Sequence, residues 1–169
     1  VMLYNGGANF LHKIGGDGGE VIVDPTNDNY IYGSSTWGRI RRSSNKGVSW
    51  SSSYITNNIV GETGDFVTAC KLDPNNAAIM YVGYANMWRS TSAKTAPAAS
   101  VAWTKISNFS GTSDKIIDFA IAPSNSSVCY VSRETAEFYR SNNLGVGATW
   151  TDLSSSLPAA ATVKDIEID

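Results

Sequence analysis

A segment of twelve residues occurs three times in this chain, and this internal repeat constrains the fold more than any other feature of the sequence. The first copy runs from Val21 to Tyr32, and the other two cover residues 70–81 and 119–130. The prolines at 25, 74 and 123 and the tyrosines at 32, 81 and 130 are both spaced by 49 residues. A constant spacing of this length is typical of tandem units that each form one supersecondary structure.

Each repeat unit is predicted to contain four short strands. The first strands are expected at 21–23, 66–72 and 116–121, the second at 30–33, 79–83 and 128–132, the third at 40–43, 87–90 and 138–141, and the fourth around Trp50, Trp103 and Trp150. Proline and asparagine after each first strand indicate a turn. No stretch shows a sustained period of 3.6 residues, so we expect an all-β fold. Four strands in a tandem unit of this length predict the blades of a β-propeller.

The repeat also divides the chain. Residues 1–14 are predicted to end a preceding blade, 15–62, 63–112 and 113–162 to form one four-stranded antiparallel blade each, and 163–169 to form the first strand of a following blade. A closed ring typically has 4–8 blades. We therefore expect about three and a half blades of an incomplete ring. The expected partners are the remainder of this propeller or a second propeller.

A second pattern lies between the third and fourth predicted strands. Residues 43–50 fit Ser-x-Asp-x-Gly-x-x-Trp with asparagine in place of aspartate, through Ser43, Asn45, Gly47 and Trp50. An Asn side chain accepts hydrogen bonds from nearby backbone N–H groups, and glycine supplies a positive φ. The third unit repeats the pattern with a two-residue insertion, through Ser141, Asn143, Gly145 and Trp150. The pattern in residues 90–103 is longer and degenerate, and we predict that all three segments are structural turns.

These turns resemble the Asp-box, or BNR, repeat. Together with the segments 15–25 and 42–50, they make nearly the whole chain similar to the large BNR-type propellers. That group includes sialidases, xyloglucanase-like glycosidases, sortilin-type receptors, photosystem assembly factors and secreted bacterial surface proteins. The resemblance implies a fold and leaves the function open, because one fold hosts many functions. It also implies that the Asp box lies far from any active site.

Cysteine and histidine give no indication of a metal or cofactor. Cys70 and Cys129 stand at apolar positions of the repeat in different units, so we expect buried free thiols rather than a disulfide. His12 is the one histidine, and no nucleophile motif accompanies it, so we expect a solvated or structural side chain. Two cysteines and one histidine do not make a zinc site of ordinary spacing.

Composition narrows the partners further. Thirteen basic residues against 15 acidic ones give a formal net charge of −2, which argues against binding to nucleic acid. No apolar run approaches the roughly 20 residues that span a bilayer, so we expect no membrane insertion. Charged residues make up 17% of the chain. This value and the polar surface rich in Ser, Thr and Asn favour a secreted or cell-surface protein.

A glycosidase needs two positioned carboxylates. Asp17 precedes a first strand, as do Asp65 and Asp114 in the other units, and repetition in every unit indicates a structural cap or rim charge. Glu134 and Glu137 are unique to the loop between the second and third strands of the third unit, where a solvated charged loop is the alternative. The weak catalytic candidates are therefore Asp17, Glu134 and Glu137, and we expect a binding protein rather than an enzyme.

Three residues are predicted to contact a ligand. Trp37 lies in a polar loop where the other units carry no aromatic residue, so it is suited to stack on a sugar or to anchor a protein, unless it packs over the blade edge. Tyr84, in the matching loop of the second unit, and Arg133 are the other two predicted ligand contacts. The arginines at 42, 89 and 140 recur with the repeat, so we predict that they are structural. The resemblance to sialidases would instead imply three arginines that bind a carboxylate group. We expect a binding or scaffold module that contacts glycan or protein through these loops. The alternative is part of a glycoside hydrolase, xyloglucanase-like or sialidase-like, whose carboxylates lie partly elsewhere.

Overall fold

The protein is described by a computed structural model that places residues 1–4, 6–7, 10–159 and 161–169. In these residues the regular structure consists of β-strands and three short 3₁₀ helices: η1 (Thr36–Gly38), η2 (Ala98–Ser100) and η3 (Ser154–Ser156). No helix in the described part of the chain is long and apolar enough to cross a membrane. The predicted all-β class is confirmed.

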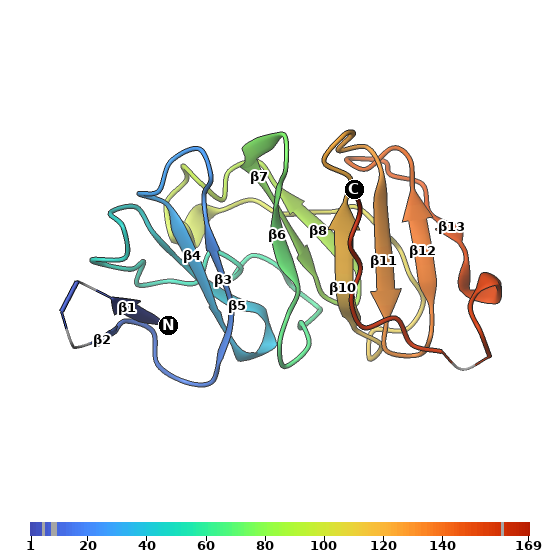
Figure 1. Cartoon of the computed structure of the whole chain (residues 1–169), viewed down its shortest axis with the longest axis horizontal. Coiled ribbons are helices and arrows are strands. Elements are labelled where there is room, and N and C mark those ends of the chain that lie inside the picture. Colours follow the sequence, from blue (N-terminus) through green and yellow to red (C-terminus); the bar gives the residue numbers. More distant parts are fainter. Residues whose placement is uncertain (5, 8–9, 160) are drawn as a thin grey trace.

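The strands form four antiparallel sheets whose neighbours follow the chain order. A hairpin pairs β1 (Met2–Tyr4) with β2 (Phe10–His12). The first sheet contains β3 (Gly18–Val23), β4 (Ile31–Ser35) and β5 (Arg39–Ser43); the second contains β6 (Cys70–Asp73), β7 (Asn76–Gly83), β8 (Met87–Ser90) and β9 (Thr104–Lys105); the third contains β10 (Ile116–Ile121), β11 (Cys129–Arg133), β12 (Phe138–Ser141) and β13 (Thr151–Asp152). Figure 1 shows these three sheets side by side, with β3, β6 and β10 toward the viewer.

Four details differ from the predicted strands. The fourth strands, β9 and β13, begin after the tryptophans rather than around them. The first sheet has no fourth strand, although the N–H of Ser51 still donates to the carbonyl of Arg42 at 2.8 Å. Residues 66–69 precede β6 rather than belonging to it, and residues 163–169 form no strand. A short segment with only one or two backbone hydrogen bonds to its neighbour does not form a regular strand. The repeat therefore predicts where these segments lie but not whether they pair as regular strands.

The hydrophobic core lies between the sheets. Tyr32 and Ile40 of the first sheet pack with Met80 and Val82 of the second. Tyr81 and Met87 of the second sheet belong to an equivalent cluster with Phe119 and Cys129 of the third. Alternate residues of one strand point to opposite faces of a sheet, so the second sheet is covered on both faces.

Polar contacts of the repeat residues also join neighbouring sheets. The indole N–H of Trp103 donates to the carbonyl of Ile55 at 2.7 Å, and that of Trp150 donates to the carbonyl of Ile106 at 2.9 Å. The guanidinium of Arg42 donates to the carbonyl of Ala96 in the second sheet at 2.9 Å. These recurring tryptophans and this arginine are therefore occupied in holding sheet to sheet.

The two cysteines are free and buried. Burial raises the pKa of the Cys70 thiol to about 12 and also raises the pKa of Cys129. Both thiols are therefore protonated at neutral pH. They are poor nucleophiles, because the thiolate is the nucleophilic form of cysteine. His12 lies exposed on β2.

Candidate functional site

The Asp-box turns lie at one end of the sheets, between the third strand and the tryptophan. The hydroxyl of Ser43 accepts from the N–H of Gly47 at 2.8 Å, and the side-chain oxygen of Asn45 accepts from the N–H of Ser49 at 2.9 Å. Gly47 has a φ of +78°, which a side chain would strain. The side chains of this turn are thus engaged with its own backbone.

The other two turns keep the same central hydrogen bond. Asn143 accepts from the N–H of Thr149 at 2.8 Å, directly before Trp150. In the degenerate copy the shorter Ser92 accepts from the N–H of Ala102 at 3.0 Å, directly before Trp103. The loop could lengthen because this one acceptor still fixes the residue that precedes the tryptophan.

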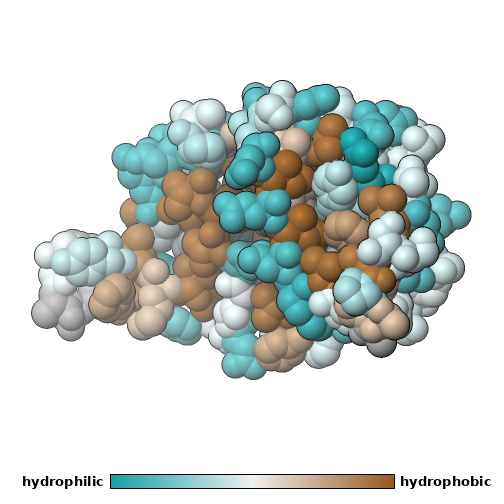
Figure 2. Space-filling view, turned by 45° about the vertical axis from the view of Figure 1, so that its right-hand side comes forward, coloured by the Kyte–Doolittle hydropathy of each residue, from teal (hydrophilic) through white to brown (hydrophobic). Residues whose placement is uncertain are grey.

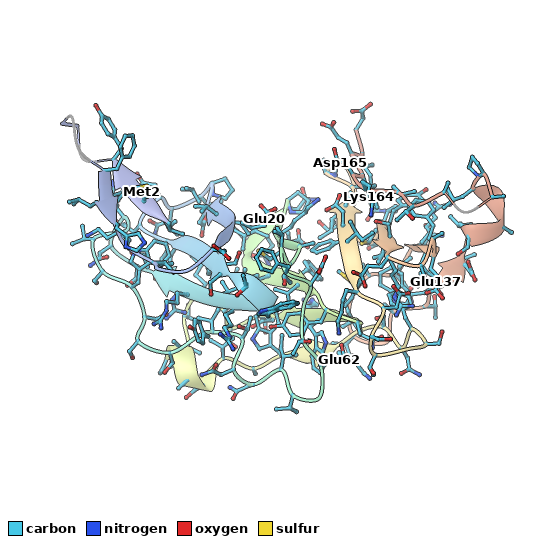
Figure 3. The ribbon with its side chains drawn as sticks, turned by 90° about the horizontal axis from the view of Figure 1, so that it is seen from below. Met2, Glu20, Glu62, Glu137, Lys164 and Asp165 are labelled. Atoms are coloured by element: carbon cyan, nitrogen blue, oxygen red, sulfur yellow. The ribbon has the colours of Figure 1, made fainter. Side chains whose placement is uncertain are left out.

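The opposite end of the sheets carries loops that differ from one sheet to the next. They connect the second strand to the third within a sheet (β4–β5, β7–β8 and β11–β12) and lead from one sheet into β6 or β10. Figure 3 views the molecule from this end. We call it the loop end, and it holds the predicted ligand contacts.

Trp37 and Phe66 form an aromatic pair at the loop end. Trp37 lies in η1 and Phe66 in the segment that leads into β6, with ring centroids 5.6 Å apart in an edge-to-face arrangement. The backbone N–H of Trp37 also donates to the carbonyl of Phe66 at 3.4 Å. The two residues remain 48% and 45% exposed. Trp37 has a φ of +66°, an unfavourable conformation for a bulky residue, so the loop holds this ring outward at a cost in strain.

Tyr84 supports this pair from below instead of lying on the surface as predicted. It is buried, and its hydroxyl donates to the carbonyl of Gly38 at 2.9 Å. Burial raises the pKa of the Tyr84 hydroxyl to about 12, so it stays a donor. A Cβ at Gly38 would lie 2.4 Å from the Tyr84 ring. Tyr84 is therefore packed against the loop that carries Trp37, and its predicted ligand contact stays a prediction.

Arg133, the third predicted ligand contact, is also buried, and its ligand contact likewise stays a prediction. Its guanidinium donates to the carbonyls of Ser110, Gly111 and Asp114 at 2.8–2.9 Å, and it pairs with Asp114 at 3.3 Å and with Glu137. A planar guanidinium presents several donors in a fixed fork. Arg133 therefore fastens the loop between the second and third sheets.

The three weak catalytic candidates do not meet in one site. Glu137 is held by Arg133 and by the hydroxyl of Tyr139, which donates at 3.0 Å. Glu134 is exposed and accepts from the N–H of Lys115 at 3.0 Å. Asp17 is exposed in the segment that leads into β3, in the first sheet, whereas both glutamates belong to the third.

Glu62 is a functional candidate that the sequence did not reveal. Its side chain is 7% exposed and accepts from the N–H of Asn86 at 3.0 Å, from the Asn86 amide at 2.9 Å and from the indole of Trp88 at 3.2 Å. It lies between the first and second sheets, whereas Glu137 lies apart from it in the third (Figure 3). The signal available was its uniqueness, since the residue 49 positions on is Gly111.

A cavity of about 190 Å³ opens between the first strands of the three sheets, and Val67, next to Phe66, lines it. Charged side chains of both signs surround an apolar floor. They are Glu20, Lys71, Asp118, Lys164 and Asp165. Lys71 pairs with Asp118 at 2.9 Å. Figure 3 shows Glu20, Lys164 and Asp165 on the side of these first strands. Val67 in the cavity wall is thus the chain neighbour of Phe66 in the aromatic pair.

Among the described residues, no cluster of three or more His, Cys, Asp or Glu side chains is arranged to hold a metal ion. The rings of Trp37 and Phe66 are half exposed at the loop end, and Glu20, Lys164 and Asp165 line the cavity between the first strands.

The chain and its structure were compared with known protein families, curated proteins and solved structures. No protein-family model matches the chain, and no curated protein is similar to it. Similar solved structures include the GH74 xyloglucanase from Xanthomonas campestris, with a TM-score of 0.53 and 19% identity over 79% of this chain, and the Niastella koreensis GH74 enzyme, with a TM-score of 0.57 and 20% identity over 80%. The chain spans only 21% and 22% of their lengths. It therefore has the fold of part of a GH74-type β-propeller, with its sheets as blades.

Proposed function

We propose that this chain is a non-catalytic glycan-binding section of a β-propeller, and that Trp37 and Phe66 form its sugar platform. The observation that carries the proposal is an aromatic pair that is half exposed although the backbone of Trp37 is strained. Exposed aromatic rings offer a large apolar area at low conformational cost. The face of a sugar ring is a chemical match for such a platform.

The neighbouring cavity supports a polar ligand. Glu20, Lys164 and Asp165 surround it and offer both hydrogen-bond acceptors and donors. A binding site usually combines apolar walls with a few polar groups that fix orientation. The volume of about 190 Å³ is small, so we infer that one ring of a longer chain enters it while the next stacks on the platform.

The engagement of the carboxylates favours binding over catalysis. Glu62 accepts from the buried Asn86, Asp114 and Glu137 pair with the buried Arg133, and Asp118 pairs with Lys71. A general acid needs a raised pKa and a free approach to the glycosidic oxygen. In this proposal the protein acts outside the cell or at its surface, where polysaccharides are found.

The test uses xyloglucan and cello-oligosaccharides as probes in isothermal titration with the 169-residue chain. Trp37→Ala is expected to weaken binding by about tenfold or more, because one stacked ring is lost. Val146→Ala is the matched control, since Val146 is an exposed apolar residue in the Asp-box turn of the third sheet. Unchanged affinity in Trp37→Ala would remove the platform from the site. If the chain bound a protein ligand tightly and bound no glycan, the proposed ligand would be a protein instead of a glycan.

Glycoside hydrolysis is the second candidate, and the similarity to two GH74 structures favours it. It requires that the full protein hydrolyse xyloglucan and that a carboxylate substitution abolish this activity. Asp17→Asn and Glu134→Gln are the variants to assay, because both side chains are exposed. Loss of activity in either one, with binding retained, would make this chain part of an active site.

A further inference from the structure

The turn that connects β7 to β8 contains two buried polar side chains. It consists of residues 84–86, and Tyr84 and Asn86 are each 4% exposed. The N–H of Tyr84 donates to the carbonyl of Asn86 at 2.9 Å, which closes the turn. A buried polar group without a partner is costly, so these two side chains need partners in neighbouring segments. Both partners belong to the loops that carry the platform.

The partner of Tyr84 lies in the loop that carries Trp37. The Tyr84 hydroxyl donates to the carbonyl of Gly38, the residue after Trp37, at 2.9 Å. The hydroxyl of Thr56 donates to the same carbonyl at 2.8 Å. The backbone beside Trp37 is therefore fixed by the second sheet as well as by its own unit.

The partner of Asn86 lies in the loop that carries Phe66. Glu62 stands four residues before Phe66, and its carboxylate accepts from the backbone N–H and the side-chain amide of Asn86 at 3.0 and 2.9 Å. The indole of Trp88 donates to the same carboxylate at 3.2 Å. The Glu62 side chain is 7% exposed, so three donors hold it in a buried position.

The segment between Glu62 and Phe66 has little conformational freedom. The carboxylate of Asp65 accepts from the N–H of Phe66 at 2.6 Å, and the hydroxyl of Thr68 donates to the carbonyl of Asp65 at 2.7 Å. A Cβ at Gly64 would lie 2.2 Å from the Thr68 hydroxyl, so the turn is tight. The placement of Phe66 therefore depends on where Glu62 is held.

Exposed apolar side chains by themselves do not mark a binding site. Figure 2 shows hydrophobic side chains at several places on one face of the molecule, between hydrophilic ones. Scattered exposure of this kind is normal. Trp37 and Phe66 have more than exposure in common, because the loops of both are anchored to one buried turn. A binding site needs such support, since its contact groups must be held within about 0.5 Å of their working positions.

We propose that Tyr84, Asn86 and Glu62 are positioning residues for the glycan platform, which set the spacing of its two rings from buried positions. Tyr84 acts on Trp37. Asn86 and Glu62 act together on Phe66. This inference rests on the proposed function and adds how the platform is built: one turn of the second sheet fixes a ring from the first sheet and a ring from the following loop.

The test measures the binding of xyloglucan and cello-oligosaccharides to the 169-residue chain by isothermal titration. Glu62→Ala removes the acceptor of three N–H groups and is expected to weaken binding about three- to tenfold, which corresponds to one net hydrogen bond. Glu62→Gln keeps one acceptor oxygen and is expected to weaken binding less. It replaces Glu62→Ala in all measurements if circular dichroism shows that the alanine variant does not fold.

Asp73→Asn is the matched control. Asp73 is also a buried carboxylate of the second sheet, but it accepts from the N–H groups of Asn75 and Asn76 at the end opposite the loop end. This variant is expected to leave glycan affinity unchanged. A loss of affinity as large as that of Glu62→Ala would overturn the inference, because any weakening of the fold would then reduce binding.

Double-mutant cycles separate positioning from a general loss of stability. Glu62→Ala is expected to weaken binding in the Trp37→Ala background and to add nothing in the Phe66→Ala background, because it acts through Phe66. Tyr84→Phe, which removes only the hydroxyl, is expected to show the opposite dependence. Equal losses in both backgrounds would overturn the inference.

The single variants distinguish failure of this inference from failure of the proposed function. If Trp37→Ala weakened binding and the folded Glu62→Ala did not, the platform would stand and its anchoring by Glu62 would be overturned. If Trp37→Ala kept full affinity, the proposed function would fail, and this inference would fail with it.

Discussion

The two ends of the sheets are built by opposite rules. At the Asp-box end, three turns of different length keep the same hydrogen bond to the residue before the tryptophan, with Asn45, Ser92 or Asn143 as the acceptor. At the loop end, equivalent junctions use opposite charges. In the loop between the first and second sheets, Glu62 accepts hydrogen bonds from Asn86 of the second sheet. In the loop between the second and third sheets, the carbonyls of residues 110 and 111 accept from Arg133 of the third sheet. The Asp-box end repeats one geometry, whereas the loop end varies its chemistry from sheet to sheet, and the proposed glycan platform lies at the loop end.

The largest effect expected at the loop end comes from Arg133→Met. This change leaves Asp114 and Glu137 without their buried cation, and breaking a buried pair costs about 3–5 kcal/mol. The free energy of unfolding, measured by urea denaturation, is expected to fall by this amount. The exposed Arg39→Met is the control and should change stability by less than about 0.5 kcal/mol. Equal losses in both variants would show that the buried fork is not what holds this loop.

Two glycines compare the ends directly, because Gly38 at the loop end and Gly47 in the Asp box both have a positive φ. A Cβ added at Gly38 would lie 2.4 Å from the Tyr84 ring, whereas a Cβ added at Gly47 would lie 3.4 Å from Leu3 and 3.7 Å from Ile31. Gly38→Ala therefore adds overpacking to backbone strain and is expected to cost about 2–4 kcal/mol, against about 1 kcal/mol for Gly47→Ala.

Glycan affinity sharpens the same comparison. Gly38→Ala displaces the loop that carries Trp37, so it is expected to weaken xyloglucan binding, whereas Gly47→Ala is expected to leave it unchanged. Denaturation and titration of the same two proteins measure both effects. If Gly47→Ala weakened binding as much as Gly38→Ala, the functional distinction between the ends would fail.

The smallest effect is a pH dependence on the side of the Asp-box turns. Burial acts to raise the pKa of Asp24, but hydrogen bonds from Lys94 and Thr26 outweigh it and hold that pKa below its ordinary value of 3.8. The buried Asp24 pairs with Lys94 at 2.6 Å. A carboxyl group with a lowered folded-state pKa stabilises the fold above its unfolded pKa, and this contribution is lost as the pH falls through the folded value.

Asp24→Asn is therefore expected to reduce the loss of unfolding free energy between pH 6 and pH 3, which chemical denaturation at both pH values measures. The matched control is Asp28→Asn, since Asp28 forms an exposed ion pair with Lys46. Exposed pairs contribute little. A pH response of Asp24→Asn equal to that of the wild type would show that the Asp24–Lys94 pair has no role in acid stability.

The repeat by itself determined the all-β class, the order of the sheets and the burial of Cys70 and Cys129, because a periodic apolar pattern with regular turns admits few other arrangements. It also located the Asp-box turns, whose hydrogen bonds are local in sequence. Trp37 was found from its uniqueness, and the structure leaves it half exposed.

Only the tertiary structure decided the roles of Tyr84, Arg133, Glu62 and Phe66. Tyr84 follows β7 directly and Arg133 is the last residue of β11, at positions where the sequence predicted exposed loops, yet packing against the neighbouring connecting loops buries both. Phe66 meets Trp37 across 29 residues, and Glu62 meets Asn86 across 24. Such contacts form between loops of neighbouring sheets, and the sequence repeat does not predict them because these loops differ from unit to unit. The sequence determined the sheets because their pairing is local and repeated, whereas the site depended on how unrepeated loops pack across sheets.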